Sequence, residues 1–118
     1  MYKIKVEAHF SAAHKLRGYR GKCEELHGHN WKVEARVSSD RLDKAGMVMD
    51  FKDLKSGLNK ILEKLDHKYL NNIPYFKKTN PTSENIASYI YERLKPQVGI
   101  LSSVTVWESE NACATYSE

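Results

Sequence analysis

Hydrophobic and polar residues alternate along two stretches of the chain, residues 2–10 and residues 29–38. The apolar positions of these stretches are Ile4, Val6, Ala8 and Phe10, and then Trp31, Val33, Ala35 and Val37. Side chains along a β-strand point to alternate faces of a sheet, so this pattern predicts two half-buried strands. The loop between them contains Gly18 and Gly21, and we expect a long antiparallel hairpin. Residues 11–14 break the phase of the first strand, which predicts a bulge or bend there.

Two later stretches carry apolar residues at helical spacing. In the first, which follows the capping residue Asp50, these are Leu54, Leu58, Ile61, Leu62 and Leu65. In the second they are Ile86, Ile90 and Leu94. Thr82 is placed to cap this second helix, and Pro96 ends it. Residues 68–81, between the two helices, show no periodicity, and we interpret them as a long loop.

Alternation returns near the end of the sequence, where Val104, Val106 and Glu108 alternate with Ser103, Thr105 and Trp107. Residues 109–111 can turn the chain into a last strand at residues 112–116. The order β-β-α-α-β-β predicts one α+β domain over residues 1–118, with a four-stranded antiparallel sheet and two helices on one face. The other face of the sheet must be covered too, or lie against water or another subunit.

Composition narrows the class of protein. With 118 residues, of which 41% are apolar and 29% charged, the chain has the profile of a single soluble globular domain. No apolar run approaches the roughly 18 residues of a membrane helix, and the first residues do not resemble a signal peptide. We therefore expect a cytoplasmic protein whose two cysteines, Cys23 and Cys113, are reduced thiols.

The net charge of +4 suits an anionic ligand. Basic residues gather in the loop of the predicted hairpin, at Lys15, Arg17, Arg20 and Lys22. A solvated loop explains these charges adequately, and a patch that steers phosphate is the alternative.

The strongest candidate for chemistry is the pair His27 and His29, with Gly28 between them. Residues two apart on a strand share a face, so both imidazoles can reach one metal ion, for which zinc is the usual choice. Two surface histidines at the start of a strand are the plainer interpretation. A catalytic zinc needs three protein ligands, and the hairpin brings His14 back towards the pair, although spacing alone does not exclude His9.

Three further groups have both a structural and a chemical interpretation. Cys23 could close the zinc site as a fourth ligand, or be a reactive thiol whose pKa is lowered by nearby Lys and Arg. Asp66 and His67 end the first helix, where a cation complements the helix dipole. Glu108 lies among apolar strand neighbours, where a carboxylate needs a partner unless it lies at an exposed edge.

Five motifs occur in a fixed order along the chain. They are Phe10-Ser11-Ala12-Ala13-His14, Cys23-x-x-x-His27-Gly28-His29-Asn30, Asp66-His67, Pro81-Thr82-Ser83-Glu84-Asn85 and Trp107-Glu108-Ser109. Together, and over the whole chain, they resemble the 6-pyruvoyltetrahydropterin synthase family. The three-residue spacing between Cys23 and His27 resembles the 6-carboxytetrahydropterin synthase branch, which serves queuosine biosynthesis, because the pyruvoyl-forming branch typically has a longer insertion there.

This resemblance implies a tunnelling fold, assembled as a hexamer (a dimer of trimers) in which the sheets join into a barrel. It also implies roles for particular residues. Zn²⁺ would be held by His14, His27 and His29, while Cys23, Asp66 and His67 would be catalytic through proton transfer. Glu108 would anchor the pterin, and Thr82 and Ser83, which also have a good interpretation as a helix cap, are weaker candidates for substrate binding.

The leading hypothesis is a zinc-dependent lyase that converts 7,8-dihydroneopterin triphosphate to 6-carboxy-5,6,7,8-tetrahydropterin, releasing acetaldehyde and triphosphate. A pyruvoyl-forming synthase and a dihydroneopterin side-chain-cleaving enzyme of folate synthesis are alternatives, the latter because Glu24 lies beside Cys23. A non-enzymatic zinc module that binds nucleic acid is an alternative of another class, but the chain lacks a basic stripe with interleaved aromatic residues. A zinc hydrolase lacks its helical His-Glu-x-x-His motif. We therefore expect a small-molecule partner, and neither nucleic acid nor a membrane.

Overall fold

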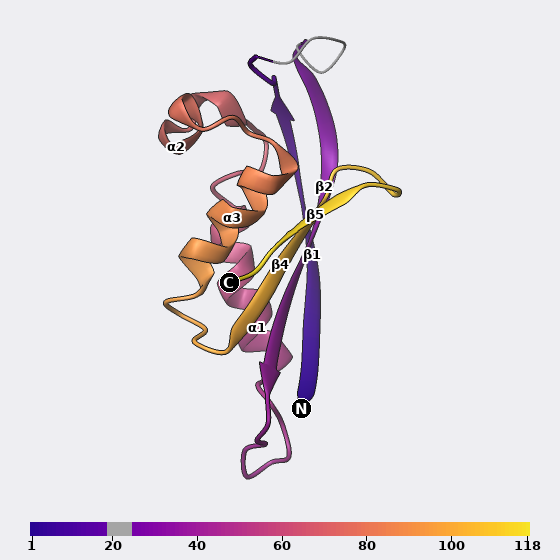
Figure 1. Ribbon diagram of the computed structural model, residues 1–118, viewed down its shortest axis with the longest axis vertical. Coiled ribbons are helices and arrows are strands. Elements are labelled where there is room, and N and C mark those ends of the chain that lie inside the picture. The colour runs from indigo at the N-terminus through magenta and orange to yellow at the C-terminus, as the bar shows by residue number, and fades with distance from the viewer. Residues whose placement is uncertain (19–24) are drawn as a thin grey trace.

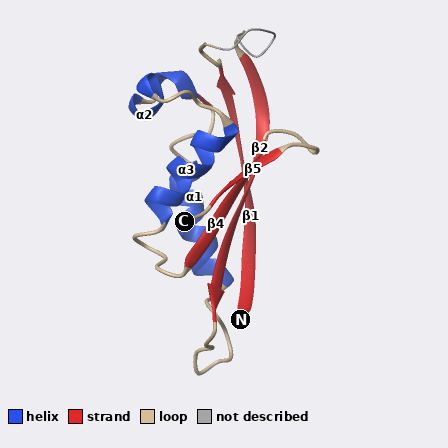
Figure 2. Cartoon of the chain, viewed as in Figure 1, coloured by secondary structure: helices blue, strands red, loops and turns tan. Residues whose placement is uncertain are grey.

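A five-stranded sheet with helices on one side forms the protein, as the computed structural model shows for residues 1–18 and 25–118 (Figure 1, Figure 2). The strands are β1 (Tyr2–His14), β2 (His27–Ser39), β3 (Lys68–Tyr69), β4 (Leu101–Trp107) and β5 (Cys113–Tyr116). The helices are α1 (Phe51–Leu62), α2 (Pro74–Lys78) and α3 (Ser83–Leu94), with a short 3₁₀ helix, η2, at Leu70–Asn72. The strand order is β3-β1-β2-β4-β5.

The predicted antiparallel sheet of four strands is confirmed, because β1, β2, β4 and β5 pair antiparallel in that order. The hairpin of β1 and β2 runs in continuous register from Tyr2 opposite Ser39 to His14 opposite His27. The bulge predicted at residues 11–14 is therefore wrong. Alternation continues through Ala12 and His14, which are buried like Phe10, and the small residue Ala13 on the other face had obscured the pattern.

The core fills the space between the sheet and the two long helices. Trp31, Val33, Ala35 and Val37 of β2 are fully buried, as are Leu54 and Leu58 of α1 and Ile86, Ile90 and Leu94 of α3. Each such aliphatic side chain stabilises the fold by about 1.5–3 kcal/mol relative to an exposed one. Both predicted helix caps are confirmed: the Lys52 N–H donates to Asp50 Oδ1 at 2.9 Å, and the Asn85 N–H to Thr82 Oγ1 at 3.1 Å.

The interpretation of residues 68–81 as a loop is wrong. This segment forms β3, η2 and α2, and β3 pairs parallel to β1 through Ala12–Lys68 and Ala13–Tyr69. Its elements are two to five residues long, too short to show a period in the sequence. Each is anchored to the rest of the protein by individual side chains that enter the core, above all Leu70 and Phe76, which are both fully buried.

The face of the sheet opposite the helices is polar. At its centre, Glu34 of β2 is only 3% exposed, because three side chains surround its carboxylate. Lys5 Nζ and Trp107 Nε1 each donate to it at 2.6 Å, and Arg36 donates at 3.5 Å. We call Lys5, Glu34, Arg36 and Trp107 the Glu34 cluster. Among the described residues, no helix combines the length and apolar character needed to cross a bilayer.

Candidate metal centre

The three histidines predicted as metal ligands meet on the helix-covered face, at the end of the hairpin. His14 and His27 form the last residue pair of the register, and His29 lies opposite Ala12. All three therefore continue the buried face of their strands beyond Trp31, whose ring packs against His14 and His29 with centroids 5.0 and 5.2 Å away. His9 has the opposite parity on β1 and is exposed, which removes the alternative ligand.

Glu108, the residue after β4, completes this group. Its Oε1 lies 2.9 Å from His29 Nε2, 3.5 Å from His14 Nε2 and 3.9 Å from His27 Nε2. The four side chains each offer one ligand atom, and these atoms all lie within 4.8 Å of one another. Ligand atoms about 2.0–2.1 Å from a tetrahedral zinc are roughly 3.3 Å apart, so the spacing fits a metal ion. We call His14, His27, His29 and Glu108 the histidine cluster.

Two of the imidazoles are held by main-chain carbonyls. His14 Nδ1 lies 2.7 Å from the Pro81 carbonyl oxygen, and His27 Nδ1 lies 2.7 Å from that of Glu25. A carbonyl only accepts, so the proton of each ring is on Nδ1 and the lone pair of Nε2 faces the centre of the cluster. This is the arrangement in which proteins present histidine to a metal.

His29 gives a direct test of whether the group fits a metal. Its Nε2 is buried and has no hydrogen-bond partner among the described residues, although Glu108 Oε1 lies 2.9 Å away as an ion-pair neighbour. Buried polar atoms without a partner are rare, and a cation between nitrogen and carboxylate would satisfy both. Burial lowers the pKa of His14 and of His29, against the opposing effect of the Glu108 charge, and so favours the neutral imidazole that ligates metals.

The predicted catalytic pair Asp66 and His67 lies apart from the histidine cluster. The Ser11 main-chain N–H donates to Asp66 Oδ1 at 2.8 Å and lowers the pKa of that carboxyl. Asp66 Oδ2 is 3.0 Å from His67 Nδ1, so the carboxylate orients the imidazole. His67 has a positive φ of 57° and an 82% exposed side chain, an uncommon backbone conformation for a residue other than glycine.

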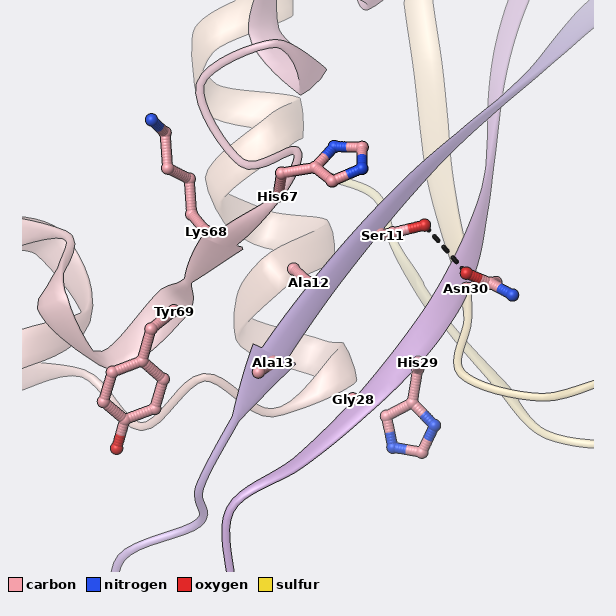
Figure 3. A pocket seen from close by; sticks show the side chains of 9 residues that line it. All are labelled: Ser11, Ala12, Ala13, Gly28, His29, Asn30, His67, Lys68 and Tyr69. Atoms are coloured by element: carbon pink, nitrogen blue, oxygen red, sulfur yellow. Dashed lines mark hydrogen bonds between the residues drawn. The ribbon is translucent and has the colours of Figure 1, made fainter.

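An open groove of about 500 Å³ crosses the end of the hairpin and is lined by His67 and His29, among others. Figure 3 shows the two rings apart, with β1 and β2 running between them in this view. Within one chain, His67 is not among the described side chains whose ligand atoms converge in the histidine cluster.

Of the remaining predicted site residues, Thr82 has its structural role at the start of α3, and Ser83 is the first residue of that helix. Cys23 lies outside the described residues, as do Glu24 and the basic residues Arg20 and Lys22. Sequence reasoning missed the Pro81 carbonyl, because a main-chain contact with His14 across 67 residues leaves no trace in side-chain patterns. It also missed Glu108 as a neighbour of the histidines, although its parity with Val104 and Val106 placed it on their face.

Comparisons with known proteins agree over the whole chain. The family model described as 6-pyruvoyl tetrahydropterin synthase matches residues 3–118. The 6-carboxy-5,6,7,8-tetrahydropterin synthase of Synechocystis is 42% identical, over 98% of this chain and 93% of its own, and that of Haemophilus influenzae is 36% identical over 100% of both. The structure of 6-pyruvoyl tetrahydropterin synthase from Caenorhabditis elegans superposes with a TM-score of 0.91 at 31% identity, covering 99% of this chain and 95% of that one.

Proposed function

The chain belongs to the 6-pyruvoyl tetrahydropterin synthase family, and we propose that it is a zinc-dependent 6-carboxy-5,6,7,8-tetrahydropterin synthase of queuosine biosynthesis. The substrate would be 7,8-dihydroneopterin triphosphate, with acetaldehyde and triphosphate as the other products. The observation that carries this proposal is the convergence of three imidazoles on one point beside a carboxylate. The relatives that share 36–42% identity and bear the carboxy-forming name support this choice of product.

His14, His27 and His29 would hold the zinc, which supplies polarisation of the substrate's side-chain oxygens and so acidifies the adjoining C–H bonds. Cys23, as a thiolate, would take a proton from such a carbon. His67 would give or take another, and Asp66 keeps its ring oriented through the 3.0 Å contact.

Glu108 would anchor the pterin. The ring presents an N–H and an exocyclic amino group along one edge, and a carboxylate can accept both, as it does from a guanidinium group. Thr82 and Ser83, at the start of α3, remain candidates for a further substrate contact.

The separation of His67 from the histidine cluster supports a site completed by a second copy of the chain. Within the described part of the chain, β1 pairs with β3 only at Ala12 and Ala13, so most of that edge is free to pair, and β5 forms the other edge. Free edges favour pairing between subunits, and we propose the dimer of trimers in which such sheets close into a barrel. Sedimentation at micromolar concentration should give a hexamer, and a monomer would exclude the shared site.

One experiment tests the activity. Zinc-loaded protein is incubated with 7,8-dihydroneopterin triphosphate, and the products are identified by mass. We expect 6-carboxytetrahydropterin and acetaldehyde. A pyruvoyl product would favour the second candidate, 6-pyruvoyltetrahydropterin synthase, which the close superposition on the C. elegans enzyme supports. Absence of any turnover would overturn the proposal.

Cys23→Ala is the matched variant for this assay. Loss of a proton-transfer group should lower kcat by about a hundred- to ten-thousand-fold. Zinc content and pterin affinity should stay as in the parent protein, because Cys23 is not a ligand in this proposal. Full activity of the variant would transfer the proton step to another group, and loss of zinc would make Cys23 a fourth ligand.

A further inference from the structure

Glu108 lies where two interactions compete for one carboxylate. The proposed function assigns it to the edge of the pterin ring. The structure, however, puts its Oε1 2.9 Å from His29 Nε2 and within 3.9 Å of the other two Nε2 atoms. Among the described acidic residues, Glu108 is the one that joins this group. The carboxylate thus completes a set of four converging ligand atoms.

The position of Glu108 follows from the strand that leads to it. Val104 and Val106 of β4 are fully buried, and the same alternation directs Glu108 to the helix-covered face. The Glu108 N–H donates to the Ala112 carbonyl at 3.1 Å, and the indole of Trp107 is held by Glu34 at 2.6 Å. The main chain around Glu108 is therefore fixed on both sides. Its side chain is 33% exposed and retains freedom to rotate.

We propose that Glu108 is the fourth ligand of the metal in the substrate-free protein, and that it leaves the metal to receive the pterin. The first half rests on the geometry of the histidine cluster, and the second half rests on the proposed function. The two roles exclude each other, because pairing with the N–H and amino group of the ring uses both carboxylate oxygens. Departure of Glu108 opens a coordination position at the moment the substrate's own oxygens arrive.

A thermodynamic consequence separates this proposal from a Glu108 that never touches the metal. If the Glu108 carboxylate binds either the metal or the pterin, a pterin without side-chain oxygens must break the bond from Glu108 to the metal. Such a pterin has no oxygen to offer the metal in its place. Such a pterin and the metal then weaken each other's binding by the same factor, since coupling between two sites is reciprocal. Without the shared carboxylate the two ligands bind independently.

The first experiment measures zinc affinity by competition with a chelator, with no substrate present. Glu108→Gln removes the charge, and Glu108→Asp keeps the charge but withdraws the carboxylate by one methylene. We expect both variants to bind zinc at least about tenfold more weakly. Mutating a residue that only hydrogen-bonds to a metal ligand already costs about that much affinity, and the loss of a direct ligand should cost no less. Glu110→Gln, two residues along the same turn, is the matched control and should bind zinc as the parent does. Zinc affinity of Glu108→Asp equal to that of the parent would overturn the proposal, since only the charge would then matter.

The second experiment repeats the zinc titration in the presence of saturating pterin that carries no side chain at C6. We expect zinc to bind more weakly in the parent protein, and an unchanged affinity would contradict a shared carboxylate. Thermal unfolding of the metal-free variants confirms that each is folded. Neither titration needs turnover, so an inactive protein with Glu108-dependent zinc binding would defeat only the proposed function. An active enzyme whose zinc affinity ignores Glu108 would defeat only this inference.

Discussion

Two clusters of polar side chains lie on opposite faces of the same sheet, and the chain passes from one to the other in a single step. Trp107 belongs to the Glu34 cluster, and Glu108 belongs to the histidine cluster. In the Glu34 cluster, a buried carboxylate receives donors from Lys5, Trp107 and Arg36. In the histidine cluster, the buried Nε2 of His29 has no hydrogen-bond partner among the described residues.

The difference shows how a structural group can be told from a functional one. The Glu34 cluster joins β1, β2 and β4 and satisfies its carboxylate from within the chain, which is what stability requires of a buried charge. In the histidine cluster, His14 Nε2 and His27 Nε2 lie 2.9 Å apart and can share a proton, whereas His29 Nε2 has no partner among the described residues, and a cation bound at the centre would satisfy all three. Variants of the two clusters should therefore separate fold stability from metal binding.

The largest effect is expected from His29→Ala. It removes one of three imidazoles, so zinc should fall from about one per subunit to none, and activity should be lost with it. The core should remain folded, because Trp31 and the leucines of α1 pack without the metal. Metal analysis and circular dichroism of the variant check both statements, and stoichiometric zinc in the variant would remove His29 from the site.

The parity of the strands made this site predictable. The shared face of His27 and His29 follows from the period-two pattern, and the return of His14 follows from the hairpin. The parity of His14 itself was hidden by the phase break that was wrongly predicted at residues 11–14. The helix caps Asp50 and Thr82 were also predictable. Each accepts a hydrogen bond from a main-chain N–H only two or three residues later, so the contact depends on the local sequence alone.

What could not be predicted depends on distant contacts. β3 and α2 are too short to carry a period, and Phe76 shows its burial only once the core is assembled. Glu34 looks like any exposed strand residue in the sequence, because Lys5 and Trp107 reach it from 29 and 73 residues away. The side chains that meet across a sheet depend on how neighbouring strands are aligned. The alignment of β4 with β2 cannot be read from either strand alone.

Glu34→Ala should have the next largest effect, and on stability alone. It removes hydrogen bonds from a lysine and an indole to a charged group and leaves the Trp107 N–H unpaired, a loss of about 3 kcal/mol in the free energy of unfolding. Lys5 is about half exposed and can return to water, which limits the cost. Urea unfolding of the metal-free protein measures the loss. Zinc affinity should be unchanged, and a parallel fall in zinc affinity would mean that the two clusters are coupled.

A slightly smaller effect is expected from acid. Burial alone would raise the pKa of Glu34, but hydrogen bonds from Lys5 and Trp107 outweigh it and hold the pKa at about 2. Because the folded pKa lies below the usual value of 4.5, the stabilisation is complete above that pH and is lost as pH falls towards 2. This group should contribute a loss of about 2 kcal/mol between pH 6 and pH 3. The free energy of unfolding is measured against pH for the parent and for Glu34→Gln, and the difference between the two profiles gives the contribution of Glu34. Identical profiles would contradict the hydrogen bonds from Lys5 and Trp107 to a charged Glu34.

The smallest effect is expected from Trp107→Phe, which tests the link between the clusters. The variant keeps an aromatic ring beneath Lys32 Nζ, which lies 4.8 Å from the ring centroid, and removes only the N–H that binds Glu34. The free energy of unfolding should fall by about 1.5 kcal/mol, the lower end of the range for a hydrogen bond to a charged group. Combined with Glu34→Ala, Trp107→Phe should lower the free energy of unfolding by less than the sum of the two changes, because both remove the same hydrogen bond.

Zinc affinity of Trp107→Phe should be retained, since the β-pairing of β4 and the bond from the Glu108 N–H to Ala112 still hold the next residue in place. If instead zinc binding weakened tenfold with so small a loss of stability, the indole would be what positions Glu108, and the Glu34 cluster would be part of the metal centre.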